Sequence, residues 1–306
     1  MSSSLSDRRT DARFQSDRNL STRMLSVMAM LAVVYAAAIF VLVRMLGRAW
    51  PLGLAVVVAF ATFQFFTSGR IAMRTMGARV VTPEQEPELH AIVDRLCALG
   101  GMNKPTVAVA ESTVPNACAV GRSKGNATLC VTRGLLDTLE PQELEGVIAH
   151  ELSHVAHGDA AVMTVAAFVG VMAGLVARVG LRLVYIGGRA RGLWHILVVA
   201  LGFIALSAAT WFVSLMLTRS LSRYREFAAD RSAAQLTGNP SALTKVSAKV
   251  TGSGGIPQVD LRKAGALNAF YFAPVTTAKT TAHHLLSTHP TTQARLDRLL
   301  RMSAKM

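Results

Sequence analysis

The 306-residue chain contains only three cysteines, Cys97, Cys118 and Cys130. Their spacing matches no metal-binding arrangement, which argues against a zinc site built from thiolates. In a reducing compartment we expect all three to be free thiols. Cys118 and Cys130 fall in neighbouring predicted strands, so a disulfide between them is the alternative if this region of the chain faces an oxidising compartment.

Acidic residues are also scarce, since 18 Asp and Glu stand against 32 Lys and Arg and leave a formal net charge of +14. The basic residues are not interleaved with aromatic ones, and no nucleic-acid-binding module is present. We therefore exclude nucleic acid as a partner. The surplus of basic residues instead suits contact with anionic lipid headgroups and can set the topology of a membrane protein. With 51% hydrophobic residues and a mean hydropathy of +0.38, the chain is too apolar for an ordinary soluble enzyme.

Four apolar runs explain this composition. A helix needs about 20 apolar residues to cross a bilayer, with roughly 17 to 25 tolerated. The first and fourth runs meet this length easily, and the second and third lie near its lower limit. The third run also fits a buried core helix. The runs cover residues 24–43, 51–66, 160–176 and 196–217.

The first run indicates a retained membrane anchor. It follows a polar tail, and no small-residue cleavage site ends it, so we do not interpret it as a signal peptide. The arginines outside the four runs favour a topology with the tail and the catalytic segments in the cytoplasm. The basic loop 177–193 runs against this topology. It leaves open a second hairpin that does not fully cross the bilayer.

The predicted organisation interleaves membrane and catalytic segments. A disordered basic tail precedes a transmembrane hairpin, and a second hairpin then separates two pieces of one catalytic domain. In chain order these segments are 1–23 (tail), 24–66 (first hairpin), 67–159 (first catalytic segment), 160–217 (second hairpin) and 218–306 (second catalytic segment). Helical periodicity predicts a helix within 80–100. Short alternating segments at 107–109, 117–120 and 129–131, separated by turns, predict a small antiparallel sheet.

Two histidines, His150 and His154, stand four residues apart and enclose Glu151 in a predicted helix. Their imidazoles lie on one helix face, so they can bind one metal ion. Glu151 can polarise a metal-bound water and act as general base. Pro141 suits the start of this helix and Gly158 its end, and apolar residues recur between them at helical intervals. The alternative is two satisfied core histidines beside a solvent-facing glutamate.

A catalytic zinc site takes three protein ligands and leaves one position for water. Ala160 stands where an extended motif would have a third histidine, and His157 could join the other two only by straining a straight helix. Glu226 is the better candidate for the third ligand. Asp230 shares its helix face and can orient one histidine, and Asp159 is a second candidate for that role. The alternative is an ordinary solvated acidic face.

These motifs, with Gly158-Asp159 and Glu226-Phe227-Ala228-Ala229-Asp230, resemble those of the HtpX-like membrane zinc metalloproteases, relatives of the CAAX prenyl endopeptidases. The resemblance covers most of the chain, with one membrane hairpin before the motif helix and one directly after it. It implies a mainly α, multi-pass membrane protein with an α+β zincin-type (gluzincin) catalytic domain. One Zn²⁺ would be held by His150, His154 and Glu226.

Residues 115–121 (PNACAVG) are similar to the family's Pro-Asn-Ala-Phe-Ala-x-Gly strand. The resemblance implies an edge strand that binds the substrate backbone through Asn116, Ala117, Cys118 and Ala119. Cys118 stands where the family usually has phenylalanine, so the side-chain preference of this strand stays open.

Ser287-Thr288-His289-Pro290, followed by Arg295, is similar to the family's C-terminal signature. By that resemblance, His289 and Arg295 would stabilise the oxyanion that forms during peptide hydrolysis. For His289, the alternative is a helix cap before Pro290.

Together these features predict a zinc endopeptidase in the bacterial inner (plasma) membrane, with its active site at the cytoplasmic face and the lipid bilayer around its helices. The resemblance implies protein or peptide substrates, namely misfolded or damaged membrane proteins removed during stress. Dedicated processing of one precursor is a second enzyme hypothesis. A membrane scaffold that has lost activity is the rival from a different class.

Overall fold

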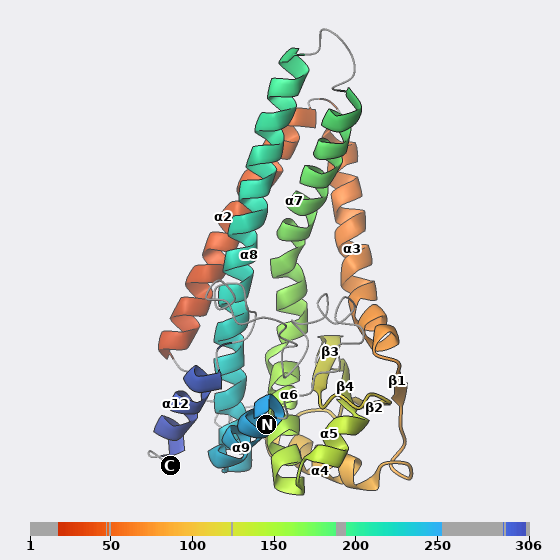
Figure 1. Cartoon of the computed structure of the whole chain (residues 1–306), viewed down its shortest axis with the longest axis vertical. Coiled ribbons are helices and arrows are strands. Elements are labelled where there is room, and N and C mark those ends of the chain that lie inside the picture. The colour runs from red at the N-terminus through yellow and green to blue at the C-terminus, as the bar shows by residue number, and fades with distance from the viewer. Residues whose placement is uncertain are drawn as a thin grey trace, which may run out of the picture. The chain divides into compact units, whose positions relative to one another are not determined.

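The chain is mainly helical and contains one small sheet (Figure 1). The computed structural model describes residues 18–46, 48, 50–123, 125–187, 194–252, 290 and 292–303. Its elements are α2 (Arg18–Leu46), α3 (Trp50–Thr75), β1 (Ala78–Val80), α4 (Pro87–Gly100), β2 (Thr106–Ala110), β3 (Ala117–Ser123), β4 (Asn126–Thr132), α5 (Arg133–Thr138), α6 (Pro141–His157), α7 (Asp159–Gly187), α8 (Trp194–Thr237), α9 (Pro240–Gly252) and α12 (Thr292–Ser303).

Two compact units make up the chain. One comprises residues 23–65 and 163–221, which include the apolar regions of α2, α3, α7 and α8. The other contains residues 66–162 and the described residues from Ser222 onwards, with the whole sheet and α6. We call the first the helical unit and the second the sheet unit. The parts of α2, α3, α7 and α8 in the helical unit are the ones that we expect to lie in a membrane.

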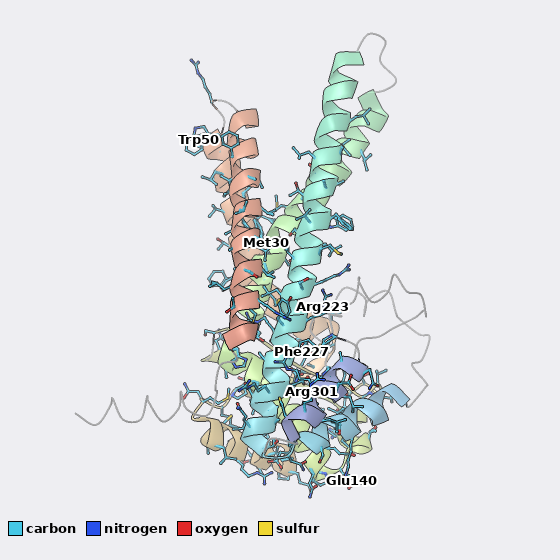
Figure 2. All side chains as sticks on the ribbon, turned by 90° about the vertical axis from the view of Figure 1, so that its left-hand side faces the viewer. Met30, Trp50, Glu140, Arg223, Phe227 and Arg301 are labelled. Atoms are coloured by element: carbon cyan, nitrogen blue, oxygen red, sulfur yellow. The ribbon has the colours of Figure 1, made fainter. Side chains whose placement is uncertain are left out.

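Three helices of the described chain are long and apolar enough to cross a membrane, with candidate spans at Thr22–Phe40, Trp50–Thr67 and Ile204–Thr237. The number of candidate spans rises to four if α6 and the beginning of α7 together form one bent span. Large apolar side chains point away from these helices, as Figure 2 shows for Met30 and Trp50, which are 55% and 42% exposed. The first, second and fourth apolar runs thus meet the criterion as single helices, and the crossing of the third stays a prediction.

Two helix boundaries differ from the expected ones. α2 begins at Arg18, so the last residues of the predicted tail are helical. α8 continues for 44 residues from the fourth apolar run into the glutamate segment, and the expected boundary at 217/218 lies inside it. After Gly202 the helix contains no glycine or proline to interrupt it. It ends at Gly238, whose positive φ of 65° is the left-handed conformation that terminates many helices.

The sheet has the strand order β1-β2-β4-β3 and is mixed. β1 pairs with β2, and β3 with β4, in antiparallel fashion, but β2 and β4 run parallel. The expectation of an antiparallel sheet was therefore wrong. β2 and β4 hold the two interior positions, and Leu129, Cys130 and Val131 of β4 are fully inaccessible. This arrangement leaves β3 at the edge.

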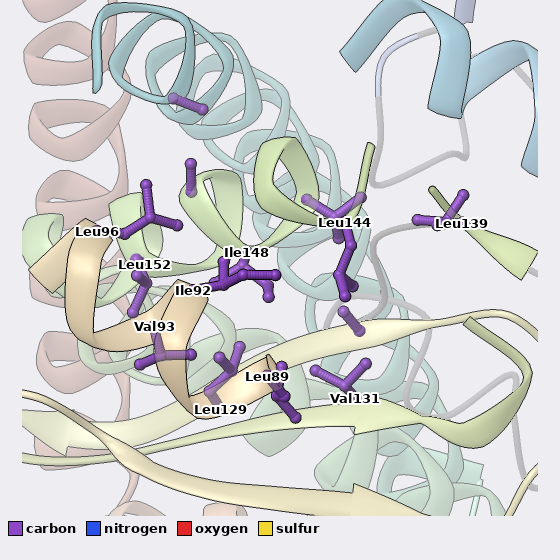
Figure 3. Close-up of a cluster of buried hydrophobic side chains, with 14 of the residues drawn as sticks. Leu89, Ile92, Val93, Leu96, Leu129, Val131, Leu139, Leu144, Ile148 and Leu152 are labelled. Atoms are coloured by element: carbon purple, nitrogen blue, oxygen red, sulfur yellow. The ribbon is translucent and has the colours of Figure 1, made fainter. Parts of the chain in front are cut away.

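The larger of two hydrophobic clusters in the described part of the sheet unit packs its helices against the sheet (Figure 3). Leu89 and Val93 of α4, Leu129 of β4, and Ile148 and Leu152 of α6 pack between the helices and one face of the sheet. A fully buried side chain of this size contributes about 1.5 to 3 kcal/mol to stability. The far end of the chain joins the same core, through side chains of α8, α9 and α12: Ala233, Ala234, Leu243, Val246 and Leu299.

The sequence signals at both ends of α6 are confirmed. Glu140 and Glu143 form a reciprocal capping box around Pro141 at the helix start, which satisfies backbone N–H groups left without intrahelical partners. Gly158 ends the helix with a φ of 69°. In the middle of α6, Gly146 lets α9 approach closely, since a Cβ there would lie 3.4 Å from the Ala242 Cβ.

Gly134 offers a test of this packing. A Cβ at Gly134 would overlap the backbone carbonyl of Thr113, whereas a Cβ at Gly125 would meet nothing within 4 Å. We expect Gly134→Ala to lower the free energy of unfolding by about 1 to 3 kcal/mol, the usual cost of overpacking. Gly125→Ala should change it by no more than about 0.5 kcal/mol. Thermal unfolding in detergent, followed by circular dichroism, measures both; equal effects would contradict the described β4–α5 junction.

Candidate metal centre

The two histidines of α6 lie one above the other on the buried face of the helix. The His150 and His154 rings meet edge to face with their centroids 4.8 Å apart, and their Nε2 atoms are separated by 3.1 Å. His150 is completely buried. The four-residue spacing therefore brings two ligand nitrogens to one point, as the sequence predicted.

Glu226 of α8 completes a group of three potential ligands. Its Oε2 lies 3.6 Å from His150 Nε2, and its Oε1 lies 3.4 Å from His154 Nε2. Ligand atoms about 2.1 Å from a tetrahedral zinc ion are about 3.4 Å apart, so the three observed separations fit such an ion. Among the described residues this is the one group of three or more His, Cys, Asp or Glu side chains with such geometry. The donor set of two imidazoles and a carboxylate suits Zn²⁺.

A second nitrogen of each histidine faces an aspartate. Asp230 Oδ1 lies 2.9 Å from His150 Nδ1, and Asp159 Oδ2 lies 2.6 Å from His154 Nδ1. A carboxylate at Nδ1 holds that nitrogen protonated and leaves Nε2 as the ligand. Each aspartate thus contacts one histidine, and the orienting role predicted for Asp230 or Asp159 stays a prediction.

A buried arginine backs each aspartate. Arg295 of α12 donates from Nε and Nη2 to the two carboxylate oxygens of Asp230, at 2.9 and 2.6 Å. Arg225 of α8 forms an ion pair with Asp159 and also donates to the backbone carbonyl of His157. Each series of contacts therefore leads from a histidine through an aspartate to an arginine: His150–Asp230–Arg295 and His154–Asp159–Arg225.

Arg225 was not among the predicted site residues. Its position directly before Glu226 was the one available signal, but a surface arginine would give the same pattern. Arg295 was predicted to act on the oxyanion, and the structure places its guanidinium on Asp230; the oxyanion role stays a prediction. His289 lies outside the described residues.

α12 has a second attachment to α8. The guanidinium carbon of Arg298 lies 5.1 Å from the centroid of the Phe227 ring, within the range of a cation–π contact. Figure 2 shows Phe227 on α8 close to α12, where Arg301 is also labelled. The residue after Glu226 therefore helps to hold the helix that supplies Arg295.

The pKa values follow from burial and from these ion pairs. Burial raises the pKa of the Glu151 carboxyl, with the neighbouring histidines acting in the opposite direction. Burial alone would also raise the pKa of Asp230, but the charge of Arg295 and the contact with His150 hold it down at about 2. Burial opposes the charge of His154, yet the carboxylates of Asp159 and Glu226 raise its pKa well above the ordinary value. The pKa of His150 shifts in the same direction, through Asp230 and Glu226.

β3 presents its outer edge to α6. Thr132 N–H donates to the Asn116 carbonyl, so alternate residues from Asn116 pair with β4 and Ala117, Ala119 and Gly121 point their backbone groups outward. The Glu151 carboxylate accepts a hydrogen bond from the Ala119 backbone N–H. The general-base candidate therefore lies at the middle of the open strand edge.

The other predicted strand residues have structural contacts. The Asn116 side chain is buried and its Oδ1 accepts from the Ala117 N–H at 2.9 Å. Cys118 lies directly opposite Cys130 and 3.7 Å from the Met76 sulfur, on the sheet face turned away from α6. All three cysteines are free thiols, as predicted.

His157 lies outside the ligand group. Its Nε2 is 3.3 Å from Ser232 Oγ, and its carbonyl accepts from Arg225. These contacts fit a role at the helix end.

Comparison with known proteins identifies the family. Residues 83–303 match the model of "Peptidase family M48". The chain is 48% identical over 297 residues to "Protease HtpX homolog 1" of Streptomyces coelicolor, covering 96% of each chain. It is 40% identical to "Protease HtpX homolog 2" of Methanosarcina acetivorans, covering 96% of this chain and 99% of that one. The crystal structure of S. mikatae Ste24p aligns with a TM-score of 0.48 and 14% identity over 92% of this chain and 66% of that chain.

M48 proteins are metallopeptidases, and the homologues with the HtpX name, together with the apolar helices, support a membrane metalloprotease. The match covers more than half of the chain and includes both histidines of α6 and the glutamate of α8. The chain belongs to peptidase family M48.

Proposed function

We propose that the protein is a zinc-dependent endopeptidase whose metal is held by His150, His154 and Glu226. The observation that carries the proposal is the convergence of two Nε2 atoms and one carboxylate. The nitrogens lie 3.1 Å apart, and the Glu226 carboxylate lies 3.6 Å from His150 Nε2 through Oε2 and 3.4 Å from His154 Nε2 through Oε1. Zn²⁺ bound there would act as a Lewis acid on a water molecule and on the substrate carbonyl. Three protein ligands leave the fourth tetrahedral position for that water.

Glu151 is the proposed general base. Its carboxylate takes a proton from the attacking water and then passes it to the nitrogen of the leaving amine, so that the C–N bond breaks without releasing an unprotonated amide anion. Burial supports this role, because a raised pKa brings a carboxyl closer to the pH at which it can both accept and donate.

The outer edge of β3 is the proposed binding site for the substrate backbone. An extended peptide beside Ala117, Ala119 and Gly121 would exchange main-chain hydrogen bonds with the strand, which fixes the peptide without reading its sequence. The contact between Glu151 and the Ala119 N–H supports this placement, since it brings the base to the same edge. Asn116 anchors the start of the strand through its bond to Ala117.

Arg295 and His289 are the proposed donors to the oxyanion of the tetrahedral intermediate. For Arg295 the support is electrostatic. Its positive charge acts on Glu226 and Glu151 as well as on Asp230, which places it near the reacting groups. Those carboxylates keep the pKa of its buried guanidinium raised, although burial by itself would lower it.

The proposed substrates are misfolded or damaged membrane proteins, cleaved at the cytoplasmic face of the bacterial inner membrane during stress. The support is the likeness to proteases with the HtpX name and the helices apolar enough to lie in a bilayer. A comparison of protein fragments in cells with and without the protein distinguishes this role from dedicated processing. Many cleavage sites are expected, and one cut in one precursor would contradict it.

Glu151→Gln tests the assigned base. The amide keeps the shape of the side chain but cannot take a proton, so peptide hydrolysis should fall by at least about 100-fold, the lower range for loss of a general base. Zinc content should stay near one ion per chain. Glu145→Gln is the matched control, because Glu145 lies on the same helix in an ion pair with Arg95 at 2.9 Å. Full activity of Glu151→Gln would end the proposed mechanism.

Glu226→Ala separates metal binding from proton transfer. Loss of one of three protein ligands should leave the purified variant with little zinc, measured by atomic emission after dialysis. Glu145→Ala should retain full occupancy. If Glu226→Ala also retains it, the third ligand lies elsewhere in the chain.

Zinc should stabilise the protein more at pH 8 than at pH 6. Without metal, His150 and His154 have raised pKa values, so the stability that their protonation contributes is fully present below pH 6.5 and is lost as the pH rises through those raised values. Zinc binds the neutral imidazoles and has the opposite pH dependence. The Tm difference between zinc-loaded and chelator-treated protein should therefore widen with pH. If the Tm difference stays constant or shrinks as the pH rises, zinc and protons do not compete for the same two histidines.

A further inference from the structure

A pocket opens beside the candidate metal centre. Its walls come from the second half of β3, the start of β4 and the junction of α6 with α7, all within the sheet unit. His154 forms one side of the pocket, and Ala119, whose N–H donates to Glu151, forms another. The pocket therefore adjoins the place where a bound peptide would be cleaved.

The pocket is small. Its volume is about 20 Å³, little more than the roughly 10 to 15 Å³ that one water molecule requires. Half of its ten lining residues carry a methyl group or no side chain at all: Ala119, Gly121, Ala127, Gly158 and Ala160. Asp159 also reaches it, but that carboxylate is engaged by His154 and Arg225.

The backbone around the pocket requires two of these small residues. A Cβ at Gly121 would lie 2.5 Å from the Asn126 carbonyl oxygen and 2.6 Å from the Ala127 Cα. Gly158 has a φ of 69°, a conformation that other residues adopt at a cost. The size of the pocket is therefore fixed by the backbone, through the β3–β4 pairing at Gly121 and the end of α6 at Gly158. Neither glycine has a side chain that could move and enlarge the pocket.

We propose that this pocket binds the side chain of the substrate residue immediately before the cleaved bond, and that it selects alanine. The inference rests on the proposed endopeptidase function. A peptide that runs antiparallel to β3 has its amino-terminal end beside the carboxyl-terminal half of that strand. The pocket extends from Ala119 in that direction, towards Ser123. A methyl group fills it, whereas leucine or phenylalanine exceeds it.

The test uses the full-length, zinc-loaded protein in detergent and a set of peptides that differ only in the residue before the cleaved bond. Gly, Ala, Leu and Phe are compared by kcat/KM, and mass spectrometry locates the cut. The wild type should prefer Ala to Leu by roughly 10- to 200-fold, the discrimination that such pockets achieve.

Ala127→Val fills the pocket from β4, where a β-branched residue suits the strand. Hydrolysis of the Ala peptide should fall to the level of the Gly peptide, so that the preference for Ala over Gly is lost. Ala160→Val fills the pocket from α7 and should have the same effect, which keeps the test valid if one variant fails to fold. Ala91→Val, on the exposed side of α4 and outside the pocket, should keep the wild-type ratio.

Three results would overturn the assignment of the pocket while leaving the proposed function intact. The first is that the wild type cleaves the Leu peptide as fast as the Ala peptide or faster, and the second is that both filled variants keep the wild-type ratio of kcat/KM values. The third is a size preference for the residue after the cleaved bond instead of the residue before it. Absence of zinc-dependent cleavage of every peptide would instead overturn the proposed function.

Discussion

The candidate site depends on a balance of buried charge. Four acidic residues, Glu151, Asp159, Glu226 and Asp230, are at most 6% exposed, and Arg225 and Arg295 are at most 7% exposed. Burying an uncompensated charge costs several kcal/mol. The two arginines pair with the two aspartates and leave two glutamates beside two histidines. A divalent cation among His150, His154 and Glu226 would complete the balance, and without it protons on the histidines take that role, which explains their raised pKa values.

This balance also links distant regions of the chain. The histidines and Asp159 come from α6 and the start of α7, Arg225, Glu226 and Asp230 from the end of α8, and Arg295 from α12. The hydrophobic core joins the same elements, since Ala233 of α8, Leu243 of α9 and Leu299 of α12 pack with Ile148 and Leu152 of α6. The apolar segments of α7 and α8 lie between these regions in the sequence. We therefore expect folding of the sheet unit to be coupled to assembly of the proposed metal site.

Local signals predicted much of this arrangement. The capping residues around Pro141, the stop at Gly158 and the four-residue spacing of the histidines act within a few residues, and each is visible in the chain. The proposal of Glu226 as third ligand followed from the chemistry of zinc and from an acidic pair on one helix face. The parallel pairing of β2 with β4 was not predictable in this way, because it depends on contacts between strands that are distant in the sequence. Arg225 was missed for the same reason: only the folded chain brings it to Asp159.

The most direct test of the proposed metal centre is X-ray absorption at the zinc edge of the purified protein. Two imidazole nitrogens at about 2.0 to 2.1 Å and oxygen ligands at about 2.0 to 2.2 Å are expected, with no sulfur, because the ligands are His150, His154, Glu226 and a water molecule. Sulfur scattering near 2.3 Å, or a third imidazole in place of the carboxylate, would contradict the convergence of α6 and α8 on one zinc ion.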